Sequence, residues 1–354
     1  GMRKAMPALL LSASCALSAC SEESVLSDAP PSETSAAPTS AVSEGAAPQD
    51  AAPEDVRARA AATLMPPALN YEDARAKLEA GVGGLFIPSW ADPELLSDGP
   101  RGVNALREEM GRDFEVSIDF EGGRVQRFSD ILGDYPSPQA MAEGHSPDEV
   151  EALATEIGHS LRAHGVTVDF APVLDVDGGD LEVVGDRAFS TDPQAAGEYG
   201  AAFARGLQAA GVKAVFKHFP GHGRASGDTH LGEAVTPPLE ELYGHEFVSF
   251  HNALPQAPDA ALMMGHLVVP GLGEEPASLN PRAYQLAREE LGYDGTIYTD
   301  DLGGMASISE NFSVPEAVAA ALAAGADMPL WSTDEDINAV IDAAAEVVAQ
   351  QEGN

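Results

Sequence analysis

Short apolar runs alternate with segments of helical periodicity over almost all of the chain after residue 56. The runs predicted to be buried strands are residues 83–87, 114–118, 166–170, 212–216, 260–264, 295–298 and 327–331. The segments predicted to be helices are residues 147–164, 193–210, 239–253, 281–291 and 314–324, with a last helix that ends near residue 351. Strict alternation of this kind implies a parallel sheet whose strands are joined by right-handed helical crossovers.

The number of strand–helix units favours a closed sheet. Seven or more units in one domain are typical of a (β/α)₈ TIM-type barrel, for which about 250 residues is usual. A doubly wound open sheet is the alternative, but no glycine-rich phosphate-binding fingerprint follows an early strand. We therefore predict an α/β fold in which residues 56–354 form a single (β/α)₈ barrel.

The N-terminal residues 1–20 are typical of a signal peptide. Arg3 and Lys4 precede an apolar run at residues 8–17, and small residues follow that run. The sequence Leu-Ser-Ala-Cys at 17–20 resembles the lipobox of bacterial lipoproteins, which implies that Cys20 becomes the lipidated first residue of the mature chain. Such a lipoprotein would be exported and held at the periplasmic face of a membrane or at the cell surface. Ordinary secretion with an unmodified Cys20 is the alternative.

Composition separates the next segment from the domain. Residues 21–55 are rich in Ser, Ala, Pro and acidic residues, so they cannot bury enough apolar surface to fold and should form a disordered linker. The only two cysteines, Cys15 and Cys20, precede this linker, so residues 56–354 contain neither a disulfide nor a cysteine ligand for a metal. The formal net charge of −38 excludes a nucleic-acid-binding protein, which would need a basic stripe.

The loop KHFPGHGRASGDTH at residues 217–230 concentrates groups that can do chemistry. It holds a Lys, three His and an Asp, and its Pro and Gly residues exclude a helix. Other polar residues also follow predicted strands, and in a barrel they would meet at the carboxyl-end rim where active sites lie. These residues are Asp119, Asp175, Lys217, His218, His266, Asp300 and Asp301.

A metal site is a possible interpretation of the same loop, because His218, His222, Asp228 and His230 could all bind zinc. However, the chain between His218 and His222 contains Pro220 and Gly221, so the pair is not the helical His-x-x-x-His of metalloproteases. Lys217 beside His218 would also repel a cation. We therefore predict no metal and no other cofactor, and we expect His222 to hold the loop by hydrogen bonds.

Four motifs in order resemble glycoside hydrolase family 3, and more narrowly its bacterial β-N-acetylglucosaminidase (NagZ-type) branch. They are DFEGGRVQRF at 119–128, GDRAF at 185–189, the loop at 217–230 and YTDDLGGM at 298–305. The resemblance covers residues 70–350, and the family has a (β/α)₈ barrel, in agreement with the alternation of strands and helices.

The resemblance implies a retaining, two-step hydrolysis. Asp300 matches the family's nucleophile, and His230, paired with Asp228, matches the general acid/base of this branch. Asp119, Arg127, Arg187, Lys217 and His218 match the residues that hold the terminal N-acetylglucosamine. The implied substrates are peptidoglycan-derived or related glycans. We expect a monomer that contacts the membrane only through its lipid.

Three alternatives remain. A β-glucosidase or β-xylosidase of the same superfamily would generally use a carboxylic acid in place of the pair formed by Asp228 and His230. Substrate-assisted catalysis by the acetamido group would need no nucleophile at Asp300. A catalytically silent sugar-binding lipoprotein would need neither residue.

Overall fold

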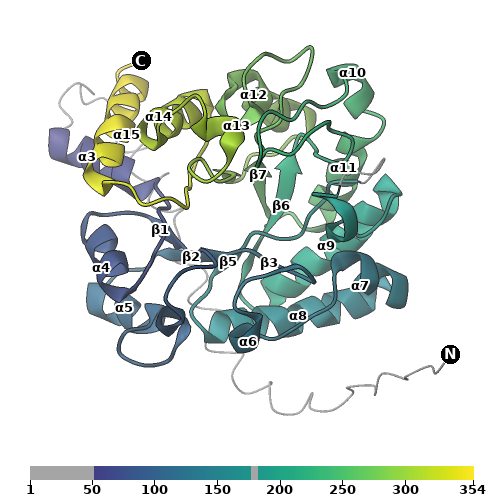
Figure 1. Cartoon of the computed structure of the whole chain (residues 1–354), viewed down its shortest axis with the longest axis horizontal. Coiled ribbons are helices and arrows are strands. Elements are labelled where there is room, and N and C mark those ends of the chain that lie inside the picture. Colours follow the sequence, from purple (N-terminus) through teal and green to yellow (C-terminus); the bar gives the residue numbers. More distant parts are fainter. Residues whose placement is uncertain (1–51, 177–181) are drawn as a thin grey trace, which may run out of the picture.

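A central parallel sheet organises the computed structural model, which describes residues 52–176 and 182–354 (Figure 1). Its strands run in the order β1-β2-β5-β6-β7-β8. Their bounds are β1 Gly84–Phe86, β2 Glu115–Ile118, β5 Val168–Asp169, β6 Lys213–Phe219, β7 Ala261–Met264 and β8 Ile297–Thr299. All neighbouring strands pair in parallel, so the prediction of an α/β fold with a parallel sheet is confirmed.

Isolated parallel bridges extend the sheet beyond its two edge strands, β1 and β8. Tyr298 in β8 bridges to Met328, Leu330 bridges to Met65, and Pro67 bridges to Phe86 in β1. The prediction of a continuous strand at residues 327–331 is therefore wrong, because this segment forms only isolated bridges at Met328 and Leu330. Pro329 has no N–H to donate to a ladder, although its carbonyl oxygen accepts a hydrogen bond of 3.0 Å from the Met65 N–H.

Every predicted helix corresponds to helical structure, although the one at 239–253 is divided, and the structure adds helices that the sequence did not predict. The helices before residue 180 are α3 Pro53–Ala62, α4 Tyr71–Glu79, α5 Val103–Met110, α6 Ser129–Leu132, α7 Pro138–Gly144 and α8 Pro147–Ala163. Those after it are α9 Pro193–Ala209, α10 Leu239–Leu242, α11 Glu246–Gln256, α12 Pro281–Glu290, α13 Ala306–Ser309, α14 Val314–Ala324 and α15 Ile337–Glu352. Short 3₁₀ helices are η3 Pro93–Leu96, η4 Gly185–Arg187 and η5 Ala277–Leu279, and a small antiparallel pair joins β3 Phe120–Gly122 to β4 Val125–Gln126.

Local signals explain where helices begin and end. The N-terminus of α8 is fixed by a capping box, in which Ser146 and Glu149 each bond the other's backbone N–H. The predicted helix 239–253 is instead two helices, because His245 has non-helical dihedral angles (φ −140°, ψ −77°) between α10 and α11.

The N-terminal predictions fall mostly outside the described residues. The expected signal peptide at 1–20, its Cys20 and most of the linker at 21–55 lie there. Helix α3 begins at Pro53, so residues 53–55 of the expected linker are helical. Ion pairs from Arg57 and Arg59 to Asp342 and Glu352 join α3 to α15, and the two helices lie side by side in Figure 1.

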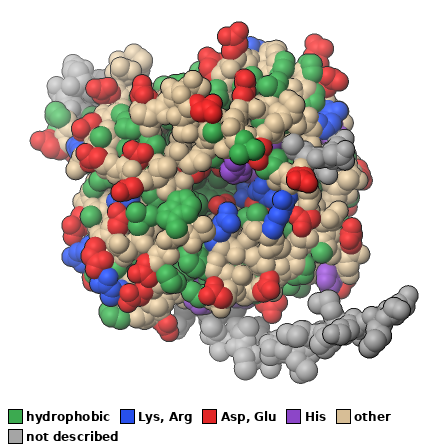
Figure 2. Space-filling view, viewed as in Figure 1, with side chains coloured by type: hydrophobic (Ala, Val, Ile, Leu, Met, Phe, Trp, Pro, Cys, Tyr) green, Lys and Arg blue, Asp and Glu red, His purple; other side chains and the backbone are tan. Residues whose placement is uncertain are grey.

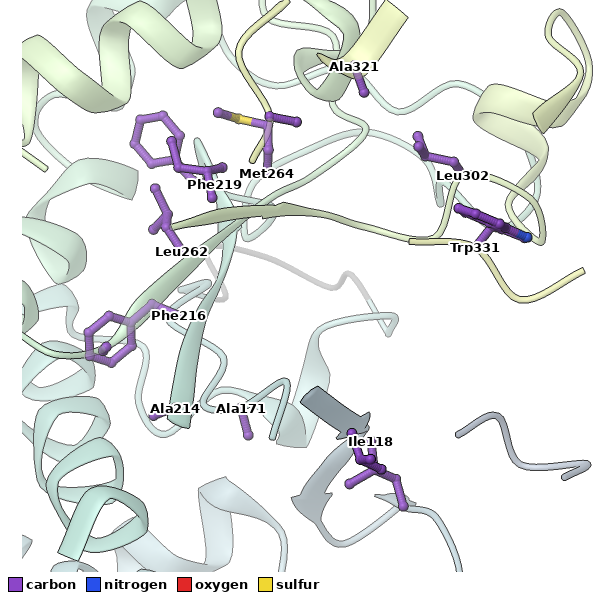
Figure 3. Packing of buried hydrophobic residues seen from close by; sticks show 14 of the residues in the cluster. Ile118, Ala171, Ala214, Phe216, Phe219, Leu262, Met264, Leu302, Ala321 and Trp331 are labelled. Carbon is purple, nitrogen blue, oxygen red and sulfur yellow. The ribbon is translucent and has the colours of Figure 1, made fainter. Parts of the chain in front are cut away.

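Side chains alternate between two apolar clusters along the strands, as the period of an extended chain requires. Val215 and Met263 belong to a small cluster on one side of the sheet, together with Phe170 and Tyr298. Phe216 and Leu262 belong to the large cluster between the sheet and the helices, and Figure 3 shows both pointing toward the helices. Among the described residues, no helix has the length and apolar character needed to cross a membrane.

Candidate active site

The carboxyl ends of the strands surround a hollow lined by basic and histidine side chains, visible near the centre of Figure 2. It contains a cavity of about 390 Å³. All of the predicted catalytic and substrate-binding residues line this cavity: Asp119, Arg127, Arg187, Lys217, His218, Asp228, His230 and Asp300. The remaining lining residues are Glu121, Arg124, Val125, Glu182 and Val183. The structure thus brings together residues that are far apart in the sequence.

Asp300 follows β8 directly, and its backbone N–H donates to the Met264 carbonyl at 2.9 Å, so the sheet fixes its position. Burial acts to raise the pKa of its carboxyl group. The charges of His218, His266 and Lys217 and a hydrogen bond from the Asp301 N–H outweigh this effect and lower the pKa to about 2. The side chain is one-fifth exposed (20%), toward the cavity. Asp300 is therefore an ionised carboxylate that a ligand can reach.

His218 lies between two carboxylates. Its Nδ1 is 2.6 Å from Oδ2 of Asp175, and its Nε2 is 3.8 Å from Oδ2 of Asp300. Asp175 also accepts hydrogen bonds from the backbone N–H groups of His218 and His222, at 3.1 and 2.8 Å. Burial acts to raise the pKa of Asp175, but the charge and hydrogen bond of His218 and the charge of His222 lower it. Asp175 therefore fixes the orientation of the His218 ring and the start of the loop.

Glu121 holds two of the predicted sugar-binding cations. Its carboxylate is bound by Arg187 Nε and Nη2, both at 2.8 Å, and lies 2.7 Å from Lys217 Nζ. Its side chain is fully buried, and burial acts to raise its pKa, yet the charges of Arg187 and Lys217 hold the pKa well below its usual range. Lys217 Nζ also lies 3.3 Å from Oδ1 of Asp119. These ion pairs fix the positions of the Lys217 ammonium group and the Arg187 guanidinium group.

His230 and Asp228 form a pair on the loop after β6. Nδ1 of His230 is 2.8 Å from Oδ1 of Asp228, which also accepts the His230 backbone N–H at 2.9 Å. Burial acts to raise the pKa of Asp228, but these two hydrogen bonds and the charge of His230 lower it. The His230 side chain is 56% exposed, so its other ring nitrogen is accessible from the cavity. The pair can hold and move one proton there.

Close backbone packing holds this loop in place. A Cβ at Gly223 would lie 1.6 Å from the Val176 carbonyl oxygen, so only glycine fits there. The N–H groups of Ala306 and Ser307 donate to the carbonyls of His230 and Thr229, at 3.4 and 3.1 Å. The loop that carries His230 is therefore tied to the segment after Asp300.

The side chains of Asp301 and His222 differ in the hydrogen bonds that they make. The carboxylate of Asp301 accepts hydrogen bonds from Gly303, Gly304 and Ser332, so it holds the turn after β8. His222 was expected to hold the loop by hydrogen bonds, but both of its ring nitrogens lack a partner among the described residues. Only its backbone N–H makes the bond to Asp175.

A second cavity of about 220 Å³ adjoins the first and shares Asp119, Arg127, His230 and Asp300 with it. Its walls combine apolar side chains, including Trp90, with polar and charged ones. No role for Trp90 was predicted from the sequence. The available signal was its position shortly after β1, since residues just past a strand end face the same rim. Within residues 52–176 and 182–354, no group of three or more His, Cys, Asp or Glu side chains is arranged to hold a metal ion.

This geometry combines an ionised carboxylate, a histidine–aspartate pair and fixed hydrogen-bond donors around one cavity, which suits the hydrolysis of a glycoside. The model of the glycosyl hydrolase family 3 N-terminal domain matches residues 58–353. The chain belongs to glycoside hydrolase family 3. Relatives of this family 3 enzyme include β-hexosaminidase LpqI of Mycobacterium tuberculosis, which is 43% identical over 295 residues, covering 81% of this chain and 73% of that protein.

Solved structures agree with this assignment. A family 3 member from Mycobacterium smegmatis superposes with a TM-score of 0.78 at 40% identity, covering 87% of this chain and 98% of that one. A family 3 β-N-acetylglucosaminidase from Paenibacillus superposes with a TM-score of 0.76 at 31% identity, covering 84% of this chain and 58% of that one. As a family 3 member, the chain is a glycoside hydrolase that acts on O-glycosyl bonds.

Proposed function

We propose that this family 3 enzyme is a retaining, exo-acting β-N-acetylglucosaminidase that removes terminal N-acetylglucosamine from peptidoglycan-derived or related glycans. The observation that carries the proposal is that Asp300 and the pair formed by His230 and Asp228 line one cavity. The names of the relatives, β-hexosaminidase and β-N-acetylglucosaminidase, support the same sugar.

In the first step, a carboxylate oxygen of Asp300 bonds to the anomeric carbon while the bond to the leaving oxygen breaks. The protonated His230 ring gives its proton to that oxygen. In the second step, the neutral ring takes a proton from water, the water oxygen bonds to the anomeric carbon, and the ester to Asp300 breaks. Two inversions retain the configuration.

The electrostatics fit these roles. The low pKa of Asp300 keeps the nucleophile ionised at neutral pH. Asp228 is ionised as well, and an adjacent carboxylate favours the protonated form of an imidazole, which is the form needed to donate a proton. A histidine acid also becomes neutral when it gives up its proton, so it does not add a second negative charge beside Asp300.

The groups around Glu121 are proposed to bind the terminal sugar. Lys217 and Arg187 bond to Glu121, and Arg187 Nη1 also donates to the Val183 carbonyl, but both side chains line the cavity and can donate to a sugar there. Asp119 accepts hydrogen bonds from sugar hydroxyl groups, and His218 donates one from Nε2. Arg127 lines both cavities and has no side-chain hydrogen bond within the described part of the chain, so it is available to the substrate.

Two further proposals concern architecture and location. We propose that the sheet closes as a (β/α)₈ barrel, with residues 65–67 and 328–330 as its remaining two strands; the bridges between β8 and β1 support this closure. We also propose that Cys20 is lipidated and anchors a monomer outside the inner membrane, on the strength of the motif at 17–20. Mass spectrometry of the exported native protein and of Cys20→Ala would test the anchor.

The decisive experiment is trapping with a 5-fluoro N-acetylglucosaminyl fluoride, which slows the second step more than the first. We expect mass spectrometry of a peptic digest to find the sugar on the peptide that carries Asp300. Asp300→Ala should neither turn over substrate nor be labelled. Turnover by the native enzyme without a label at Asp300 would favour substrate-assisted catalysis, and retained activity in Asp300→Ala would reject the assignment.

Two rival functions are tested with other substrates. Faster hydrolysis of nitrophenyl β-glucoside than of the nitrophenyl N-acetylglucosaminide would favour the β-glucosidase or β-xylosidase alternative. Sugar binding without hydrolysis of either compound would favour a catalytically silent sugar-binding protein.

A further inference from the structure

An exposed tryptophan lies beside the reacting groups. Trp90 is 63% exposed, and it lines the cavity of about 220 Å³ that also contains His230 and Asp300. Figure 2 shows hydrophobic side chains on one border of the hollow and basic side chains on the other. A large apolar side chain left in water at the mouth of a cavity indicates a binding surface.

The backbone under Trp90 is fixed although its side chain is exposed. The Ala91 N–H donates to the Pro88 carbonyl at 3.0 Å, and the Asp92 N–H donates to the Leu69 carbonyl at 2.8 Å. Ala91 itself is buried. The turn therefore presents the indole from a rigid base, and little backbone freedom remains to be lost when a ligand stacks on it.

The indole is also unoccupied by other protein groups. In the part of the chain that the structure describes, Trp90 makes no hydrogen bond and no contact with another aromatic ring. The other tryptophan, Trp331, is instead buried in the core with an exposed fraction of 1%. The free indole face is therefore available to a ligand.

The two cavities differ in the side chains that line them. The cavity of about 390 Å³ holds Arg187, Lys217 and Glu121, which suit the hydroxyl groups of an enclosed terminal sugar. The second cavity is lined by buried apolar side chains, including Phe86 and Met263, by the exposed Trp90, and by polar groups that it shares with the first cavity. An exo-acting enzyme encloses the terminal sugar, so the group beyond the scissile bond must extend outward from Asp300.

We propose that Trp90 is the stacking platform for the leaving group and that this group is a pyranose ring. A pyranose has an apolar face of C–H bonds that packs on an aromatic ring, while its hydroxyl groups remain in water. The inference rests on the proposed glycosidase function and adds its substrate class, which is a disaccharide or longer glycan. Trp90 is thus a residue that determines leaving-group specificity.

The kinetic test compares two substrates that share the terminal sugar. Chitobiose carries a pyranose leaving group, and N-acetylglucosaminyl β-fluoride carries only fluoride. Trp90→Ala should lower kcat/KM for chitobiose about 3- to 10-fold, as expected for the loss of one stacking contact, and leave the fluoride within about twofold. Trp90→Phe should restore most of the loss. Tyr243→Ala, at an exposed aromatic residue (43%) outside both cavities, is the matched control and should change neither substrate.

Equal losses of kcat/KM for both substrates would place Trp90 against the terminal sugar and overturn the proposal. No loss of kcat/KM for either substrate would also overturn it. A binding test separates this failure from a failure of the proposed function. In Asp300→Asn, chitobiose should change the emission of the exposed Trp90, whereas N-acetylglucosamine should not, and Trp90→Phe should abolish the response. A response to chitobiose supports the platform even where hydrolysis fails, and equal responses to both sugars would reject it.

Discussion

Nε2 of His218 lies 3.8 Å from Oδ2 of Asp300, while the opposite nitrogen of the same ring is bonded to Asp175. The ring is buried, and it faces the carboxylate proposed to attack the sugar. Its charge is, after burial, the largest influence on the pKa of Asp300, and it acts to lower that pKa. His218 therefore helps to keep the carboxylate of Asp300 ionised, in addition to its proposed contact with the sugar.

This relationship predicts a shift in the pH profile. The neighbouring charges lower the pKa of Asp300 to about 2, so its carboxylate is fully ionised at pH values well above 2. His218→Asn removes the neighbouring charge, so the pKa should rise and the acid limb of kcat/KM should move to higher pH. Profiles measured from acid to neutral pH test this shift. His251→Asn, at an exposed histidine paired with Glu290, is the control, and an unmoved acid limb in His218→Asn would contradict the mechanism.

The role of His230 predicts a dependence on the leaving group. His230→Ala should slow the hydrolysis of chitobiose by about 10²- to 10⁴-fold, the usual contribution of a general acid. A dinitrophenyl leaving group needs no proton, so its release in the first step should be slowed far less. Pre-steady-state kinetics on both substrates would measure that step. The same factor for both leaving groups would exclude His230 as the acid.

The buried charges around Glu121 predict a large loss of stability. Glu121→Gln leaves Lys217 and Arg187 without their shared carboxylate, and breaking such a buried pair costs about 3–5 kcal/mol of the free energy of unfolding. The control is Asp186→Asn, which breaks an exposed pair with Arg124 and should cost about 0–1 kcal/mol. Urea unfolding of both variants gives the comparison. Similar losses in the two variants would show that burial does not strengthen the Glu121 pairs.

Two glycines of the same loop predict opposite outcomes. A Cβ at Gly223 would collide with the Val176 carbonyl oxygen, whereas a Cβ at Gly232 would meet nothing within 4 Å. Gly223→Ala must displace the loop that carries His230, and a misplacement of this kind can cost about 100-fold in rate. Gly232→Ala should leave the rate within about twofold. Steady-state kinetics on chitobiose would test both, and equal rates would show that the loop adapts without cost.

The sequence predicted most of the sheet because each strand is a short apolar run bounded by turn residues. It failed at residues 327–331, where the apolar pattern continues but Pro329 interrupts the ladder, and at the junction of α10 and α11, where nothing in the pattern marks His245 as non-helical. Backbone hydrogen bonding determines the secondary structure at both places, and hydrophobic periodicity does not predict that bonding.

The candidate site was predictable to the extent that it lies at strand ends and in recognisable motifs. Asp300 and Asp119 follow strands and His218 lies near the carboxyl end of β6, so their meeting at one rim follows from a parallel sheet. The partners inside the site were not predictable in the same way. Trp90 was missed because an isolated aromatic residue after a strand has no distinctive spacing, and its exposure appears only once the chain is folded.

The proposed nucleophile and the proposed acid are supported by different parts of the molecule. Asp300 is held by the sheet through Met264, whereas His230 is held by a loop that rests on Asp228 and on backbone contacts. Substitutions within that loop can therefore alter the strength or reach of the proton donor while the attacking carboxylate stays in place. Proton transfer and nucleophilic attack can therefore be tuned separately during evolution, which gives one scaffold a route to new leaving groups without rebuilding its glycosyl pocket.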